Sequence, residues 1–146
     1  RLFLPKEMAR VSYFGMGPME SYCDKHHAAS HGYFSSTIWQ QHEDYIRPQE
    51  NGSHYDCDYV QLDGAGIKLT AVGAKPFCFN ASHYTQEELT EKAHNYELHP
   101  CDSTVLCLDY AQNGIGSASC GPRLAEQYRL DDASFDFSIR LIPEKA

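Results

Sequence analysis

The property that most constrains the fold of this chain is an alternation of apolar and polar side chains with a period of two. The clearest run has an apolar side chain at every second position, at Phe135, Phe137, Ile139 and Leu141. Successive side chains of a strand point to opposite faces of its sheet, so this run predicts a half-buried strand over residues 134–141. A strand with one solvent-facing side is typical of an antiparallel sheet.

Further runs predict more strands of the same kind. We expect them at residues 11–14, 55–60, 67–72, 77–82 and 104–110. In the second of these runs, the alternation places Tyr55, Cys57 and Tyr59 on one face. The run at 104–110 is more apolar and suits an interior strand. Residues 62–67 contain two glycines that tolerate positive φ, and they predict a hairpin.

A single short helix is predicted between the strands. Thr85 can cap its N-terminus, and Glu88, three residues on, completes the pattern of a capping box. The helix would cover residues 86–93, with Leu89 and Ala93 on its buried side. Short strands separated by turn residues, with one short helix, predict an all-β fold, an antiparallel β-sandwich.

Composition excludes several classes of function. The net charge of −8, from 12 basic and 20 acidic residues, includes no basic stripe of the kind that binds nucleic acid. The same charge disfavours an anionic membrane surface, and no apolar run is long enough to span a bilayer. The six cysteines form no C-x-x-C pair, which leaves either reduced thiols in a cytosolic protein or three disulfides. Reduced thiols and a cytoplasmic location are favoured, with a periplasmic one as the alternative.

Two motifs carry more information than ordinary turns. The first contains Gly15, Gly17, Pro18, Glu20, Tyr22 and Asp24, and the second contains Pro48, Glu50, Asn51 and Gly52. They are followed in order by segments 76–85, 97–99, 108–116 and 117–122. In this order, the motifs resemble the C-terminal, small-chain region (domain 5) of the bacterial β-galactosidases of glycoside hydrolase family 2, over nearly the whole chain.

The resemblance implies a supersandwich of the galactose-mutarotase type. Residues 1–146 would be a single domain, the C-terminal part of that small-chain domain, with an unpaired sheet edge where the rest is missing. The opening residues 1–5 have no signal-peptide pattern, and we expect them to begin within a strand of a longer protein. The parent would be a retaining β-galactosidase that hydrolyses substrates such as lactose, and it would form a homo-oligomer.

The resemblance places the catalytic glutamates in a barrel domain outside this chain. It implies no catalytic residue, metal site or cofactor within residues 1–146, and Mg²⁺ and Na⁺ sites in the parent's other domains. The partners of this chain would then be the barrel, the other domains and a β-galactoside at the mouth of the active site, with no nucleic acid and no membrane.

The expected substrate-binding residues are Ser119, Cys120 and Gly121. The resemblance implies that their loop reaches the mouth of the active site. At the position of Cys120, some members of the family carry a tryptophan that stacks on the sugar or aglycone, whereas a cysteine cannot stack. The alternative is that Cys120 is a small loop residue without ligand contact.

Other candidate residues favour structural roles. Glu20 and Glu50 are expected to hold loops by accepting backbone N–H bonds or by pairing with Arg47. The histidines that cluster in sequence, His26, His27 and His31, followed by His42 and His54, are expected at the surface or in loop packing rather than at a metal. Trp39 is expected to pack partly buried rather than to bind sugar.

Two other functional readings stay open. The chain could be the small subunit of a split, heteromeric β-galactosidase. It could also be a free-standing carbohydrate-binding or mutarotase-like module, with His83 and Glu50 as its candidate pair.

Overall fold

The described strands of the chain pair into one antiparallel sheet. The computed structural model describes residues 1–116 and 120–145. The strands are β1 (Leu2–Pro5), β2 (Arg10–Gly17), β3 (Ser30–Thr37), β4 (Ser53–Gly64), β5 (Ile67–Ser82), β6 (Ser103–Asp109) and β7 (Ile139–Lys145). The helices are α1 (Gln86–Glu91) and three 3₁₀ turns, η1 (Ile38–Gln41), η2 (Asn95–Glu97) and η3 (Glu126–Tyr128). The prediction of a mostly β, antiparallel fold with one short helix is confirmed.

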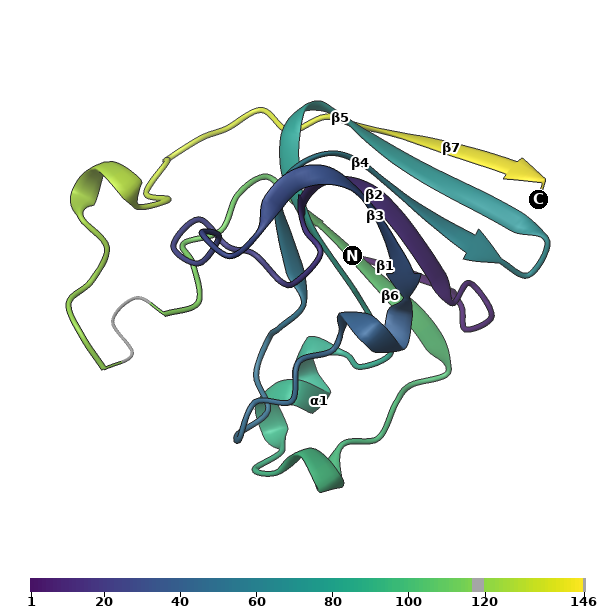
Figure 1. The fold of residues 1–146 in the computed structure, drawn as a ribbon, viewed down its shortest axis with the longest axis horizontal. Helices are drawn as coiled ribbons and strands as arrows, with labels where there is room; N and C mark the ends of the chain where they lie inside the picture. Colours follow the sequence, from purple (N-terminus) through teal and green to yellow (C-terminus); the bar gives the residue numbers. More distant parts are fainter. Residues whose placement is uncertain (117–119, 146) are drawn as a thin grey trace.

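The long strand β5 connects two parts of the sheet (Figure 1). The strands follow the order β1-β6-β5-β4-β2-β3, and β7 pairs with β5 beside this path. The first half of β5 pairs with β7, from Ile67↔Lys145 to Gly73↔Ile139. Its second half pairs with β6, from Cys78↔Asp109 to Ser82↔Val105. Because all described strands belong to this one sheet, the second sheet of the predicted sandwich stays a prediction.

The core lies along the middle strands. Its fully buried side chains include Val11, Tyr13, Val60, Leu62, Phe77, Phe79 and Leu106. Cys78 and Asn80 are also buried, so β5 is covered on both faces at this point, and the predicted wet face is absent there. The hairpin at 62–67 is confirmed: Gly64 pairs with Ile67, and Ala65 and Gly66 have φ values of 53° and 74°.

A bulge in β4 overturns the predicted face of Tyr55, Cys57 and Tyr59. Only Cys57 of the three is buried. The register with β5 shifts on both sides of Cys57, and Asp56 has a φ of 54°. A bulge inserts an extra residue, and it thereby moves the side chains beyond it to the other face of the sheet. After the bulge it is therefore Val60, rather than Tyr59, that enters the core.

The C-terminal strand begins later than its alternation predicted. β7 starts at Ile139, and residues 134–138 are exposed. The side chains of Phe135 and Leu141 are 58% and 45% exposed, so the predicted half-buried face is wrong. Phe135 stacks instead on Tyr110, with ring centroids 4.6 Å apart. The strand starts where β5 offers backbone partners, and that condition cannot be read from local alternation.

Two other elements differ from expectation. β3 covers residues 30–37, so His31 lies in an edge strand rather than in a loop. Helix α1 ends at Glu91, and Ala93 is exposed, although Leu89 is buried as expected. The hydroxyl of Thr85 caps the helix by accepting from the N–H of Glu88. The Glu88 side chain accepts from the N–H of His99. Among residues 1–116 and 120–145, no helix is long and apolar enough to cross a bilayer.

Candidate functional site

The first motif begins within β2 and continues into the turn that follows this strand. β2 ends at Gly17, and a tight turn follows in which the backbones of Tyr22 and Lys25 bond to each other at 2.9 and 3.0 Å. The N–H of Ser21 donates to the carbonyl of Ser53 at 2.7 Å. The turn is therefore tied to the start of β4. These bonds bring the two sequence motifs together although they are about thirty residues apart in the chain.

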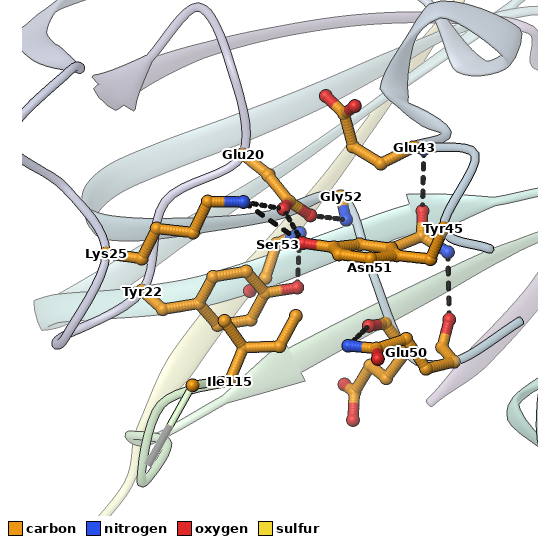
Figure 2. A network of polar contacts seen from close by, with 12 residues as sticks. Glu20, Tyr22, Lys25, Glu43, Tyr45, Glu50, Asn51, Gly52, Ser53 and Ile115 are labelled. Carbon is orange, nitrogen blue, oxygen red and sulfur yellow. Dashed lines mark hydrogen bonds and ion pairs between the residues drawn. The ribbon is translucent and has the colours of Figure 1, made fainter. Parts of the chain in front are cut away.

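Glu20 lies at the centre of this junction (Figure 2). Its carboxylate accepts from Lys25 Nζ at 2.5 Å, from the backbone N–H of Gly52 at 2.8 Å and from the Tyr45 hydroxyl. The side chain of Glu20 is 3% exposed, whereas that of Lys25 is 52% exposed. We call these four residues the Glu20 cluster. All of its bonds are charge-assisted, and such bonds are roughly twice as strong as neutral ones.

The charge balance of the Glu20 cluster favours its ionised form. Burial alone would raise the pKa of Glu20, but the hydrogen bonds from Lys25, Tyr45 and Gly52 outweigh it and lower that pKa. The hydrogen bond to Glu20 raises the pKa of Lys25. A carboxylate held in this way is a poor proton donor near neutral pH. The expectation that Glu20 holds loops together is confirmed, but its cationic partner is Lys25 and not Arg47.

The second motif closes the junction from the other side. The Oδ1 of Asn51 accepts from the N–H of Glu43 at 3.0 Å, and its Nδ2 donates to the carbonyl of Gln49 at 2.9 Å. Gly52 has a φ of 69°, and a Cβ there would lie 2.2 Å from the carbonyl oxygen of Gln41. The motif therefore requires glycine at this position.

Glu50 faces different surroundings from Glu20. It lines a cavity of about 330 Å³ with Tyr22, Asp109 and Ile115 among its neighbours. Burial and the charge of Asp109 raise the pKa of Glu50. Burial also raises the pKa of Asp109, whose Oδ2 accepts from Gln112 at 3.3 Å. The expected backbone bond or Arg47 pair of Glu50 is not among the contacts of the described residues.

The segment that leads to the expected substrate loop rests against the first motif. The Asp24 carboxylate accepts from the N–H of Ile115 and from the N–H of Gly116, both at 3.1 Å. The Cys23 thiol donates to the carbonyl of Gln112 at 3.3 Å. We call residues 112–116 the loop base. It is held by the turn that also carries the Glu20 cluster.

The expected substrate-binding residues lie just beyond the loop base. Cys120 and Gly121 are exposed, and a Cβ added at Gly121 would be obstructed by no atom of the described residues. Ser119 lies outside the described residues. The segment that follows returns to the sheet: Leu130 donates its N–H to Asn113 Oδ1 at 2.6 Å. A cavity of about 900 Å³ separates this returning segment from Cys23, Tyr55 and the neighbouring part of the sheet.

The histidines occupy several separate environments. His26 stacks on Tyr55 with ring centroids 5.5 Å apart, and His31 packs edge-on against Phe14 with ring centroids 4.9 Å apart. His54 is in the core rather than at the surface, and burial lowers its pKa to about 4. Within residues 1–116 and 120–145, no three His, Cys, Asp or Glu residues form a group able to hold a metal ion.

Two further candidates and the thiols can be placed in the fold. Trp39 is 50% exposed and packs against His83, with ring centroids 4.6 Å apart. His83 is buried, and its Nδ1 contacts the carbonyl of Ser103 at 3.4 Å. It is not among the residues that line the Glu50 cavity. All six cysteines are free thiols, and three of them are buried.

Sequence comparison identifies the class of domain to which these features belong. The model of the family described as "Beta galactosidase small chain" matches residues 1–141. The chain therefore belongs to the β-galactosidase small-chain family, as the resemblance indicated. The match covers the Glu20 cluster, the Glu50 cavity and the loop base.

Individual relatives give the same result. The chain is 51% identical to a β-galactosidase of Actinobacillus pleuropneumoniae over 145 residues, and 44% identical to one of Staphylococcus xylosus over 140 residues. A β-galactosidase of Arthrobacter sp. (strain B7) is 35% identical over 147 residues. These alignments cover 99%, 96% and 97% of this chain but only 14% of each relative. The chain thus spans about one seventh of the length of the curated relatives it matches.

Proposed function

We propose that this chain is the C-terminal part of the small-chain domain of a retaining β-galactosidase, with the catalytic glutamates on a barrel domain outside it. In that enzyme, the chain completes one side of the active-site pocket and contributes to the quaternary structure. The parent hydrolyses terminal β-D-galactosides such as lactose. The observation that carries the proposal is the match over residues 1–141 to a domain family whose relatives are seven times longer.

The roles of the two best-placed glutamates support a non-catalytic chain. A retaining glycosidase needs two carboxyl groups about 5–5.5 Å apart on either side of the bond that breaks. The carboxylate of Glu20 already accepts from Lys25, Tyr45 and Gly52, and it is buried. It therefore has no room to approach a sugar. Glu50 faces Asp109 across a small cavity and not Glu20.

The position of Cys120 supports a contact at the edge of the pocket. Cys120 and Gly121 are exposed, and they follow a loop base that is fixed to the rest of the chain. An exposed residue beyond a fixed base suits a contact with a neighbouring domain or with the aglycone. Because a thiol cannot stack as an aromatic ring does, the contact from Cys120 would be weak, and another residue would dominate aglycone binding.

Hydrolysis of a chromogenic β-galactoside tests this proposal. The assay compares this chain alone, the barrel-containing remainder of the parent alone, and the two mixed. We expect activity only in the mixture. Activity from the chain alone would overturn the proposal and return attention to Glu20 and Glu50. Full activity from the remainder alone would show that the chain does not complete the pocket.

A split, heteromeric β-galactosidase is the second candidate, and the same residues would serve it. Sequencing the gene decides between the two, because an upstream barrel on the same polypeptide excludes a separate small subunit. A mutarotase-like module built on His83 and Glu50 has less support. His83 is buried against Trp39, whereas Glu50 lines a cavity with Tyr22 and Asp109.

A further inference from the structure

The first motif contains a second carboxylate whose contacts differ from those of Glu20. Asp24 accepts two backbone N–H bonds from consecutive residues, Ile115 and Gly116, at 3.1 Å each. More than ninety residues of chain separate Asp24 from these donors. A carboxylate that receives one N–H on each oxygen fixes both the position and the orientation of the peptide units that donate to it.

The backbone at Gly114 is shaped to fit this carboxylate. Gly114 has a φ of 89°, a backbone conformation that residues with a side chain rarely adopt. A Cβ at this position would lie 2.3 Å from Asp24 Cγ and 2.4 Å from its Oδ1. The chain therefore passes so close to Asp24 that only glycine fits. Two independent features, the paired N–H bonds and the required glycine, place the loop base against one side chain.

Neighbouring contacts hold the same short segment. The Cys23 thiol donates to the carbonyl of Gln112 at 3.3 Å, and Leu130 donates to Asn113 Oδ1 at 2.6 Å. Cys120 follows Gly116 by four residues, and a Cβ added at its exposed neighbour Gly121 would have no described atom within 4 Å. Asp24 thus acts on the last two described residues before Ser119, Cys120 and Gly121 in the sequence.

We propose that Asp24 is a positioning residue, which fixes the loop base from which the chain continues to Cys120 and thereby tunes the binding of the aglycone. This inference rests on the proposed function, in which Cys120 lies at the edge of the active-site pocket. Asp24 itself does not touch the substrate. It acts through the backbone of Ile115 and Gly116.

The test uses the complete protein that contains this chain. Asp24→Ala removes both acceptors, and Asp24→Asn keeps the size of the side chain but leaves one acceptor oxygen. Asp131→Asn is the matched control. Asp131 is an exposed acid on the returning segment, and its substitution changes the charge by the same amount as Asp24→Asn. Hydrogen–deuterium exchange of the peptide covering 113–122 reports the contact directly, and kinetics with a nitrophenyl and a methyl β-galactoside report its effect.

We expect faster exchange at residues 113–122 in Asp24→Ala, a smaller increase in Asp24→Asn and none in Asp131→Asn. We expect KM for the nitrophenyl galactoside to rise about twofold in Asp24→Ala, because the aglycone contact that Asp24 positions is itself weak, with little change in kcat or in KM for the methyl galactoside. If Asp24→Ala does not fold, the graded effect of Asp24→Asn carries the test.

Three outcomes would overturn the inference. The first is unchanged exchange at 113–122. The second is faster exchange with unchanged kinetics, and the third is an equal loss on both substrates, which indicates a purely structural role. The mixing assay with wild-type chains keeps these results separate from a failure of the proposed function, since that assay does not depend on Asp24.

Discussion

Glu20 and Asp24 lie four residues apart in one motif, yet they serve two different regions of the molecule. Glu20 is buried, and it joins a lysine, a tyrosine and a backbone amide at the start of β4. Asp24 lies at the surface and holds the backbone of Ile115 and Gly116. One short motif can therefore combine a stabilising carboxylate with a positioning one. Burial and partners distinguish the two roles.

This difference predicts different consequences on substitution. Changes around Glu20 should lower the free energy of unfolding. Changes around Asp24 and Cys120 should leave stability nearly intact and alter aglycone kinetics.

Glu20→Ala should have the largest effect. It leaves the N–H of Gly52 and the hydroxyl of Tyr45 without their acceptor in a buried place. Breaking a buried ion pair from one side costs about 3–5 kcal/mol, and because Lys25 is half exposed we expect about 3 kcal/mol. Urea unfolding of the chain measures this loss in the free energy of unfolding. The transition is monitored through the fluorescence of Trp39, the only tryptophan of the sequence.

Asp58→Ala is the control for that substitution, because Asp58 is an exposed acid on β4. It should change the free energy of unfolding by less than about 0.5 kcal/mol. Equal losses for Glu20→Ala and Asp58→Ala would show that the Glu20 cluster does not stabilise the junction.

The burial of His54 predicts that the free energy of unfolding decreases in acid. The ring packs between Tyr13 and Phe79, with centroids 4.2 and 5.0 Å away, and burial lowers its pKa from 6.5 to about 4. Between these two values the unfolded chain binds a proton that the folded chain does not, so stability falls as pH falls through this window. The total contribution is about 3 kcal/mol.

The pH dependence of urea unfolding in wild type and in His54→Gln isolates this contribution. The variant should lack the part of the slope between pH 6.5 and 4 that His54 provides. His27→Gln is the control, since His27 is exposed, and it should keep the wild-type slope. A slope in His54→Gln equal to that of the wild type would exclude His54 as the cause.

Gly52→Ala and Gly66→Ala form a matched pair. Both glycines have positive φ, 69° and 74°, but only at Gly52 would a Cβ collide, 2.2 Å from the carbonyl oxygen of Gln41. A Cβ added at Gly66 would have no described atom within 4 Å. The left-handed conformation alone costs about 1 kcal/mol for alanine, so we expect about 1 kcal/mol at Gly66 and about 2–3 kcal/mol at Gly52.

Urea midpoints of the two glycine variants measure that difference directly. If Gly66→Ala and Gly52→Ala lowered the free energy of unfolding equally, the collision with Gln41 would be relieved by a small backbone shift. The second motif would then be less tightly closed than its contacts indicate, which would weaken the contrast between the two regions.

The sequence predicted the parts of the fold that depend on local pattern. The alternation at Phe77 and Phe79 gave a buried stretch of β5, and the glycines at 64 and 66 gave the hairpin. β3 was missed because Ser30–Thr37 has no regular apolar alternation, as its exposed edge position allows. The bulge at Asp56 has no signature in residue type, so the faces of Tyr55 and Tyr59 were predicted wrongly.

The candidate site shows the same division. The two motifs could be recognised from their residues, but their contacts are distant in sequence. Tyr45 became a partner of Glu20 only through the fold, and Asp24 reaches Ile115 across 91 residues. Arg47, which directly precedes the second motif, was expected to pair with Glu20. The turn at residues 22–25 instead places Lys25, a near neighbour in sequence, beside Glu20.

Cys120→Trp should give the smallest effect in free energy and the most selective one. In the complete protein, an indole at this exposed position offers a face on which an aromatic aglycone can stack, which a thiol does not. A stacking contact contributes about 1 kcal/mol, so KM for a nitrophenyl galactoside should fall about fivefold. KM for a methyl galactoside should stay unchanged, and so should the urea midpoint. Cys120→Ser, the matched control, should resemble wild type on both substrates. An equal change in KM for both substrates, or no change for either, would place Cys120 away from the aglycone. Glu20 and Asp24 would then differ in their structural contacts but not in any effect on substrate binding.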